Sequence, residues 1–181
     1  MNRGILLLCV GAALVWSTAF VATAFEGRYA AAFAVPEKGN DDRIADEIVS
    51  VRGILRIAYR NSKAVLYNAL GGLSAGIYTA LNLAVNGGSL GFYVGLARER
   101  GLIWSDIAAY ILPHFAELLA LWISGGVGFA AAGLFFRWLR SSTPPDPADF
   151  ITLAVMMGVS EMFVLMGAVW EVFVSVGIRT L

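Results

Sequence analysis

The chain has 181 residues, of which 59% are hydrophobic and 14% are charged, against about 45–50% and about 25% in soluble domains. Its 13 basic residues balance its 13 acidic residues, so no excess positive charge is present to hold a nucleic-acid backbone. One cysteine and one histidine exclude an internal disulfide and a Cys/His zinc site. These figures argue against an ordinary cytosolic enzyme and a nucleic-acid binder, and they predict an integral membrane protein embedded in a lipid bilayer.

The first apolar run, about 5–25, has 21 residues and no charge. A helix of this length crosses a hydrocarbon core of about 30 Å. A secretory signal peptide is the alternative, because Asn2-Arg3 is weakly basic and Ala22-Thr23-Ala24 resembles a cleavage site. We favour a membrane helix.

The segment 26–63 is the only long polar stretch, and it carries seven Lys or Arg residues. Within it, apolar residues at steps of three and four predict an amphipathic helix over about 41–60. Arg52, Arg56 and Arg60 lie in a row beside the apolar stripe. The helix either lies in the membrane interface, with these arginines at anionic head groups, or packs against the protein or a second subunit. The positive-inside rule would place this segment in the cytoplasm.

A second span is predicted over about 64–85. On a helical wheel, the residues of one side are small or polar: Asn68, Gly72, Ala75, Thr79, Asn82 and Asn86, with Gly71 and Gly76 at the edges. Amides at membrane depth need hydrogen-bond partners. We therefore favour a fixed network between helices, with a wet cavity as the alternative.

Asn86-Gly87-Gly88 predicts an interruption, and the segment 89–112 contains two apolar pieces that are each too short to cross the bilayer. The segment is therefore predicted to be broken or re-entrant, or else to begin with a short tilted span.

Two further full-length spans are predicted over about 115–136 and 150–176, separated by a proline-rich connection. Together these elements predict an all-α fold: one membrane domain over 1–181, with four secure spans, the broken fifth element and the amphipathic helix. Glycines at close helix contacts are expected at four positions: Gly72, Gly76, Gly125 and Gly128.

Four ionisable residues fall within or beside the spans: His114, Glu117, Glu161 and Glu171. Because charges at membrane depth are costly, they are expected to face the bundle interior. We favour a structural role for Glu117 as acceptor from the asparagine row. A proton-responsive pair with His114 is the alternative, and these two residues alone are too few to bind a metal.

Glu161 and Glu171 are about 15 Å apart along a helix and do not form an acid–base pair. No phosphate loop or nucleophile elbow is present in the sequence. The sequence therefore predicts neither an enzyme, nor a cofactor, nor a bound metal.

The spacing Asn68…Gly72…Gly76…Thr79…Asn86-Gly87…Gly91, followed by Leu112-Pro113-His114…Glu117 and Gly125-Gly126-Val127-Gly128, resembles the stage II sporulation protein M family. The last helix, with Glu171 and Phe173, is similar to that of the family. The resemblance covers about 59–176. Family members usually have glycine after the histidine, where this chain has Phe115.

The resemblance implies a multi-pass protein of the prokaryotic plasma membrane that acts as a non-enzymatic scaffold. The small-residue faces of two spans predict that this scaffold self-associates, because such faces favour close helix contacts within or between protomers. Its implied partners are cell-wall hydrolases, since the family's namesake is similar to a scaffold that tethers peptidoglycan-degrading proteins during engulfment. The alternative is a transporter or channel subunit, including the permease of an exporter driven by an ATPase. Its polar site would involve Asn68, Asn82, Asn86, His114 and Glu117.

Overall fold

A computed structural model describes residues 3–30 and 50–179 of the chain, and these residues are all-helical, with no strand among them. The long helices are α1 (Arg3–Ala30), α3 (Val51–Ala69), α4 (Ile77–Glu99), α6 (Phe115–Ser141) and α7 (Pro147–Arg179). The short elements are the 3-10 helices η2 (Leu70–Ser74) and η3 (Leu112–His114) and the two-turn helix α5 (Trp104–Ile111). The all-α prediction is confirmed.

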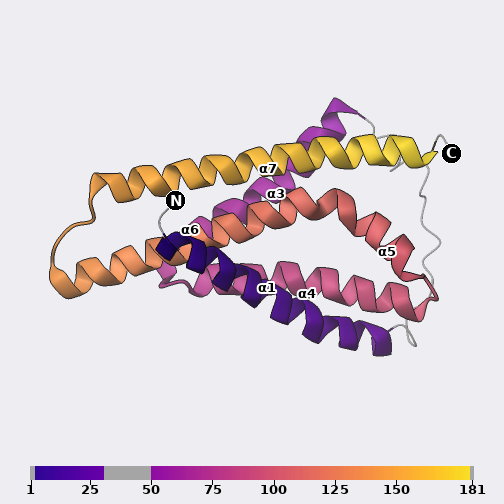
Figure 1. Cartoon of the computed structure of the whole chain (residues 1–181), viewed down its shortest axis with the longest axis horizontal. Helices are drawn as coiled ribbons and strands as arrows, with labels where there is room; N and C mark the ends of the chain where they lie inside the picture. The colour runs from indigo at the N-terminus through magenta and orange to yellow at the C-terminus, as the bar shows by residue number, and fades with distance from the viewer. Residues whose placement is uncertain (1–2, 31–49, 180–181) are drawn as a thin grey trace.

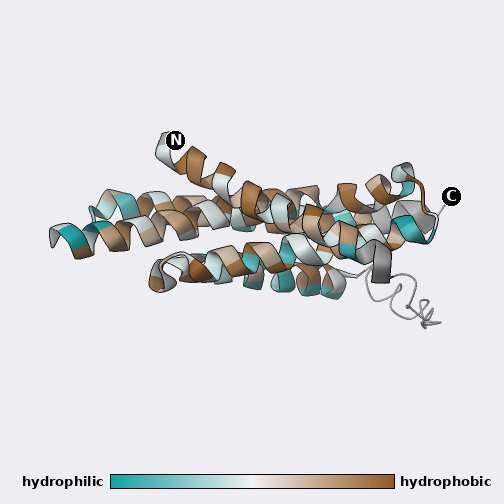
Figure 2. Ribbon diagram, turned by 90° about the horizontal axis from the view of Figure 1, so that it is seen from below, coloured by the Kyte–Doolittle hydropathy of each residue, from teal (hydrophilic) through white to brown (hydrophobic). Residues whose placement is uncertain are grey.

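The long helices run roughly along one axis (Figures 1 and 2). α3 and α4 form one antiparallel hairpin, and α6 and α7 form a second hairpin that projects beyond the α3–α4 turn (Figure 1). α1 packs along α4 and also contacts α6. The C-terminal ends of α4 and α7 lie with α5 at the opposite end of the molecule from the α6–α7 connection (Figure 1).

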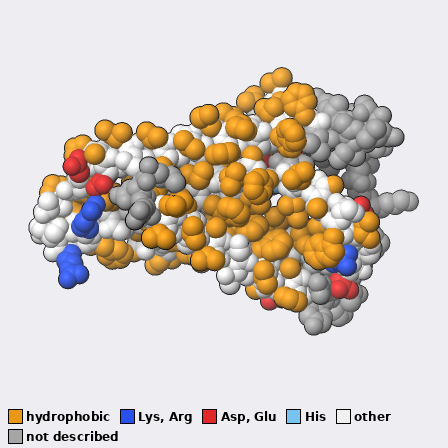
Figure 3. Space-filling model, in the orientation of Figure 1, with side chains coloured by type: hydrophobic (Ala, Val, Ile, Leu, Met, Phe, Trp, Pro, Cys, Tyr) orange, Lys and Arg blue, Asp and Glu red, His pale blue; other side chains and the backbone are white. Residues whose placement is uncertain are grey.

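Three helical segments have the length and the apolar composition of membrane spans: Gly4–Glu26, Phe115–Ser141 and Pro147–Phe173. They match the spans predicted over 5–25, 115–136 and 150–176. Figure 3 shows apolar side chains over the middle of the molecule and charged side chains gathered mainly towards its two ends. Such a distribution suits a bundle whose middle faces lipid.

The single span predicted over 64–85 is wrong, because the chain turns back between its two halves. α3 ends at Ala69, and α4 begins at Ile77. Between them, Ala75 and Gly76 have left-handed backbone angles, with φ of 54° and 86°, a conformation that ends helices and that glycine adopts at little cost. The small and polar residues assigned to one helix face therefore belong to α3, to α4 and to the turn that joins them.

The interruption predicted at Asn86-Gly87-Gly88 is also wrong, since α4 continues through it to Glu99. Gly87 and Gly91 serve a different purpose. A Cβ atom at either position would collide with the backbone of α1, at the carbonyl oxygens of Trp16 and Phe20. These glycines allow the two helices to approach closely, as small residues do in membrane bundles. The chain breaks instead at 100–103, where Gly101 has a φ of 86°.

The amphipathic helix predicted over 41–60 is seen in part, because 41–49 lie outside the described residues. The described part belongs to α3, which begins after Ser50, whose Oγ accepts a hydrogen bond from the Gly53 backbone N–H at 3.0 Å. Ala58 and Val65 of α3 are buried against α6 and α7. Packing against the protein itself, one of the two alternatives, therefore holds for α3.

Candidate functional site

Asn68 is the centre of a buried polar network that joins three helices. Its side chain is fully buried. Its amide nitrogen donates to Ser124 Oγ of α6 at 2.8 Å and to the Leu121 carbonyl at 3.2 Å, and its amide oxygen accepts from Asn82 Nδ2 of α4 at 2.8 Å. Thr79 Oγ1 donates to the Asn68 carbonyl at 2.8 Å. The structure thus brings these predicted polar residues together in a network between helices.

The network continues along α4 and back to α3. Asn82 Nδ2 also donates to the Ala64 carbonyl at 2.8 Å, and Asn86 Nδ2 donates to the carbonyl and side-chain oxygens of Asn82 at 2.8 and 3.1 Å. Each amide donor of the row therefore has an internal acceptor. This pairing removes most of the cost of placing amides at membrane depth.

The four predicted packing glycines have different surroundings. A Cβ at Gly125 would lie 2.8 Å from the Ala12 Cβ of α1, and a Cβ at Gly128 would collide with the Asn68 carbonyl of α3. A Cβ at Gly72 would lie 2.9 Å from the Ala131 Cβ of α6, whereas Gly76 has the left-handed angle of the α3–α4 turn. These small-residue faces are occupied by helix contacts within the chain, so they carry no argument for contacts between protomers.

At the junction of α5, η3 and α6, His114 and Glu117 meet Glu171 of α7. His114 Nδ1 lies 3.1 Å from Glu117 Oε2 and 3.6 Å from Glu171 Oε2. Gly167 of α7 leaves room for this arrangement, because a Cβ there would lie 2.6 Å from Glu117 Cγ. We call these three ionisable residues the His114 cluster.

The structural role predicted for Glu117 is wrong, since Asn68 bonds to α6 through Ser124 and Leu121 rather than through this carboxylate. Glu117 Oε1 is buried and has no hydrogen-bond partner among the described residues. Glu161 lies outside the cluster and accepts a hydrogen bond from Ser62 of α3 at 2.6 Å. The structure therefore separates Glu161 from Glu171, as their spacing predicts.

His114 precedes the span Phe115–Ser141, and its environment favours the protonated imidazole. The hydrogen bond with Glu117 raises the pKa of His114 above its ordinary value of 6.5. Burial acts in the opposite direction, and the charges of Glu171 and Glu117 add to the increase. The pKa of His114 is raised on balance.

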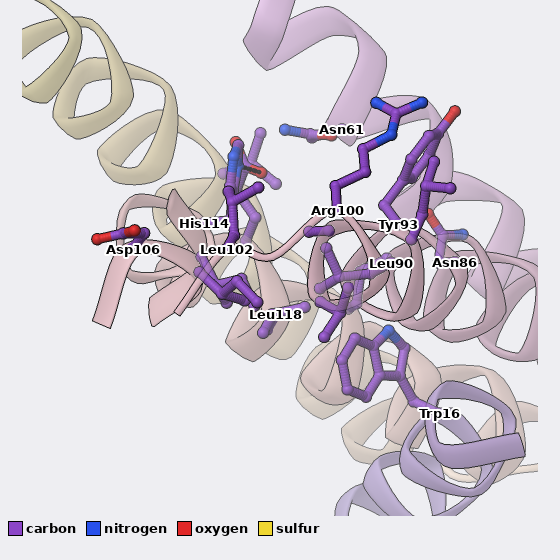
Figure 4. A pocket seen from close by; sticks show the side chains of 18 of the residues that line it. Trp16, Asn61, Asn86, Leu90, Tyr93, Arg100, Leu102, Asp106, His114 and Leu118 are labelled. Carbon is purple, nitrogen blue, oxygen red and sulfur yellow. Dashed lines mark hydrogen bonds and ion pairs between the residues drawn. The ribbon is translucent and has the colours of Figure 1, made fainter. Parts of the chain in front are cut away.

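Two cavities adjoin the cluster. The larger, of about 610 Å³, is partly open and mostly apolar, and it is lined by residues of α1, α3, α4, α5, η3, α6 and α7. Figure 4 shows Trp16 at one end and His114, Asn61 and Arg100 at the other. The smaller, of about 220 Å³, is lined by the cluster together with Ile57, Arg60 and Asn61.

Trp16 contributes a polar group, its indole N–H, to the apolar end of the larger cavity. This side chain is 6% exposed, and its Nε1 has no hydrogen-bond partner among the described residues. In Figure 4 the indole nitrogen points towards Leu90 and the interior of the cavity. A cavity of this volume, largely apolar and with a few polar groups, is typical of a binding site.

The cluster lies near one edge of the apolar zone. Glu117 is 20 residues before Arg137 in α6, which corresponds to about 30 Å of helix and about one hydrocarbon thickness. Arg137 binds Asp149 of α7 at 3.0 Å near the opposite end. If that ion pair marks one membrane border, the cluster lies at the other, on the same side as the exposed Arg52, Arg56 and Arg60 of α3.

Comparison with known proteins identifies the family of the chain. A family model of stage II sporulation protein M matches residues 4–176. The chain belongs to this family. The family is not a known enzyme family, and the match together with the three apolar helices indicates a membrane protein.

The chain is also similar to the uncharacterized protein MJ0793 of Methanocaldococcus jannaschii, with 27% identity over 150 residues that cover 79% of this chain and 83% of that protein. No solved structure matches the chain.

Sequence reasoning missed the residues that adjoin the predicted site from other helices. Trp16, Asn61 and Arg100 line the larger cavity with His114, and no local pattern identifies them. One signal was present in the sequence for the cluster. Glu117 lies 24 residues before the end of α6 at Ser141, and Glu171 lies 24 residues after the start of α7 at Pro147, so an antiparallel hairpin brings them to the same level.

Proposed function

We propose that this protein is a non-enzymatic membrane scaffold that binds a partner membrane protein through its larger cavity. The observation that carries the proposal is the presence of a mostly apolar cavity beside a polar network whose donors are paired within the chain. The asparagine donors are paired internally, whereas the cavity is apolar over most of its lining and partly open. A rigid bundle with an apolar recess is suited to holding another apolar segment.

The occupant that fits best is an apolar segment of a second protein. The indole N–H of Trp16 calls for a hydrogen-bond acceptor, which a backbone carbonyl or a Ser or Thr hydroxyl supplies. The lining carries charges of both signs, since it includes Arg100 as well as Asp106 and Glu117. An anionic lipid head group would face these two carboxylates, whereas a polypeptide can present both signs.

The proposed location is the prokaryotic plasma membrane, with the helices crossing it several times. The partner classes that family membership suggests are cell-wall hydrolases, and an ATPase would indicate an exporter instead. Self-association is also part of the proposal. It would have to use outward apolar faces, such as those of α1 and α7, since the predicted glycine faces are occupied within the chain.

Photo-cross-linking in native membranes tests the proposal. A benzophenone amino acid at Leu90, which lines the cavity, should give a cross-link to a partner protein, and the same group at Leu81, on the exposed face of α4, should not. Ala97→Trp fills the cavity and should abolish the Leu90 cross-link, while Leu81→Trp should preserve it. Lipid adducts alone at Leu90, or a partner cross-link unaffected by Ala97→Trp, would contradict a protein occupant in this cavity.

A second candidate function is transport. The buried Glu117 Oε1 favours it, because this atom has no hydrogen-bond partner in the part of the chain that the structure describes and Glu117 lines both cavities. The continuous α4 and the paired asparagines remove the other features on which transport was predicted. Flux through reconstituted vesicles that is lost in Glu117→Gln and kept in Glu161→Gln would support transport. The absence of flux for ions and small solutes would leave the scaffold as the better proposal.

A further inference from the structure

The His114 cluster has the composition of a metal site, although neither the sequence analysis nor the family match assigns one. His114 and Glu117 alone supply too few ligands. Glu171 of α7 adds the third, and one ligand atom from each of the three residues lies within 4.8 Å of the other two. We propose that His114, Glu117 and Glu171 bind one divalent transition-metal cation, with Zn²⁺ as the ion that fits best.

The distances in the cluster match those around a tetrahedral ion. Zinc binds imidazole nitrogen and carboxylate oxygen at about 2.0–2.2 Å, which places two ligand atoms of a tetrahedron about 3.3–3.6 Å apart. The distances from His114 Nδ1 to the Oε2 atoms of Glu117 and Glu171 are 3.1 and 3.6 Å. Small adjustments of these side chains would therefore place all three atoms around one centre.

The charge and burial of the cluster also favour a cation. Two carboxylates face one imidazole, and the single hydrogen on Nδ1 cannot point along both directions at once. Glu117 is the most enclosed member, with a side chain that is 12% exposed and an Oε1 that has no hydrogen-bond partner among the described residues. A cation between the three residues would neutralise both carboxylates and coordinate Glu117.

The ligand types select the class of metal. Imidazole nitrogen suits zinc and the other late transition metals, whereas calcium and magnesium prefer sites built from oxygen alone. Three protein ligands leave a fourth tetrahedral position for water. The cavity of about 220 Å³ beside the cluster has room for it.

Arg60 is the competing positive charge, because it lines the same small cavity as the cluster. In the metal-free protein, a protonated His114 and Arg60 can balance the two carboxylates. A metal ion has to displace the proton from His114 Nδ1 and compete with the guanidinium. Removal of the Arg60 charge should therefore strengthen metal binding. If the cluster forms only salt bridges and binds no metal, the same change should leave metal affinity undetectable.

Zinc retention by the full-length protein tests the site. The protein is purified in mild detergent without a polyhistidine tag, stripped with a chelator, incubated with Zn²⁺, desalted and analysed for zinc per chain. We expect about one Zn²⁺ per chain at saturation. His114→Ala and Glu171→Gln should each weaken the affinity at least tenfold, and Arg60→Gln should increase it several-fold.

Glu161→Gln is the matched control, because it removes a carboxylate from the same helix outside the cluster. It should retain zinc like the original protein. Zinc retention that does not exceed that of His114→Ala, or an equal loss in Glu161→Gln, would overturn the proposal.

A second measurement covers variants that fold poorly. Zn²⁺ should raise the melting temperature of the unmodified protein and of Glu161→Gln, and it should leave that of Glu171→Gln unchanged. In the unmodified protein, Co²⁺ should give the strong visible absorption typical of four-coordinate sites. Weak octahedral absorption, or an equal Zn²⁺ shift in Glu171→Gln, would contradict a tetrahedral site at these residues.

Discussion

The asparagine network makes a quantitative prediction about what holds the bundle together. Asn68→Ala removes three hydrogen bonds between helices: two to α6, at Ser124 and Leu121, and one from Asn82 of α4. The partners keep other bonds, because Asn82 still donates to the Ala64 carbonyl and Ser124 still donates to the Leu121 carbonyl. The loss is therefore that of the three bonds, without additional unpaired donors.

Hydrogen bonds between membrane helices contribute about 0.6 kcal/mol each on average and at most about 1.7 kcal/mol. Three bonds predict that Asn68→Ala lowers the free energy of unfolding by about 2 kcal/mol, with an upper limit of about 5 kcal/mol. Asn86→Ala is the matched control, because the bonds that its amide donates stay within α4. Its effect should stay below about 0.6 kcal/mol.

The assay is reversible unfolding in mixed micelles, followed by circular dichroism. A double-mutant cycle of Asn68→Ala with Ser124→Ala should give a coupling of about 0.6 kcal/mol for their shared bond. If Asn68→Ala proves no more destabilising than Asn86→Ala, the network does not hold the helices together as described.

Three further predictions follow from the helix contacts and the cluster. Gly91→Ala should weaken the packing of α1 on α4, because its Cβ would collide with the α1 backbone, while Gly133→Ala, which has open space, should be neutral; an equal melting temperature for the two variants would contradict the contact. Gly167→Ala should displace the Glu117 side chain and lower both the melting temperature and zinc retention. Unchanged zinc retention would show that Gly167 does not determine the position of Glu117. Because the folded-state pKa of His114 is raised, its stabilising contribution should be complete below pH 6.5 and be lost as the pH rises through that pKa. The difference in stability between the original protein and His114→Gln, measured with a chelator present, should therefore shrink at alkaline pH. A difference that grows with pH would contradict a raised pKa for His114.

The long apolar spans could be predicted because the local composition of the chain determines where they begin and end. Continuous apolar runs bounded by charges or prolines place α1, α6 and α7 close to their observed limits. The packing positions of Gly125 and Gly128 follow from the same small-residue pattern. Each of these features depends on residues that are close together in the sequence, so it can be predicted without knowledge of the tertiary structure.

The α3–α4 turn could not be predicted from helical periodicity. Asn68 and Asn82 share one side of a helical wheel, and they also meet across the turn, so both arrangements produce the same pattern of polar residues. The turn depends on the left-handed angle of Ala75, for which alanine gives no signal. In α4, Gly87 indicates either a break or a helix contact, and the choice depends on whether α1 lies beside it, which local sequence does not show.

The contacts of α1 also have a consequence for the order in which the protein assembles. Trp16 of α1 packs against Gly87, 71 residues later in the chain, and Cys9 packs against Gly126, 117 residues later. At synthesis rates of about 5–20 residues per second, the second of these partners emerges about 6 to 23 seconds after the helix that needs it. α1 therefore completes its packing only after both α4 and α6 have been synthesised. Lipid or the insertion machinery must cover its inner face during that interval.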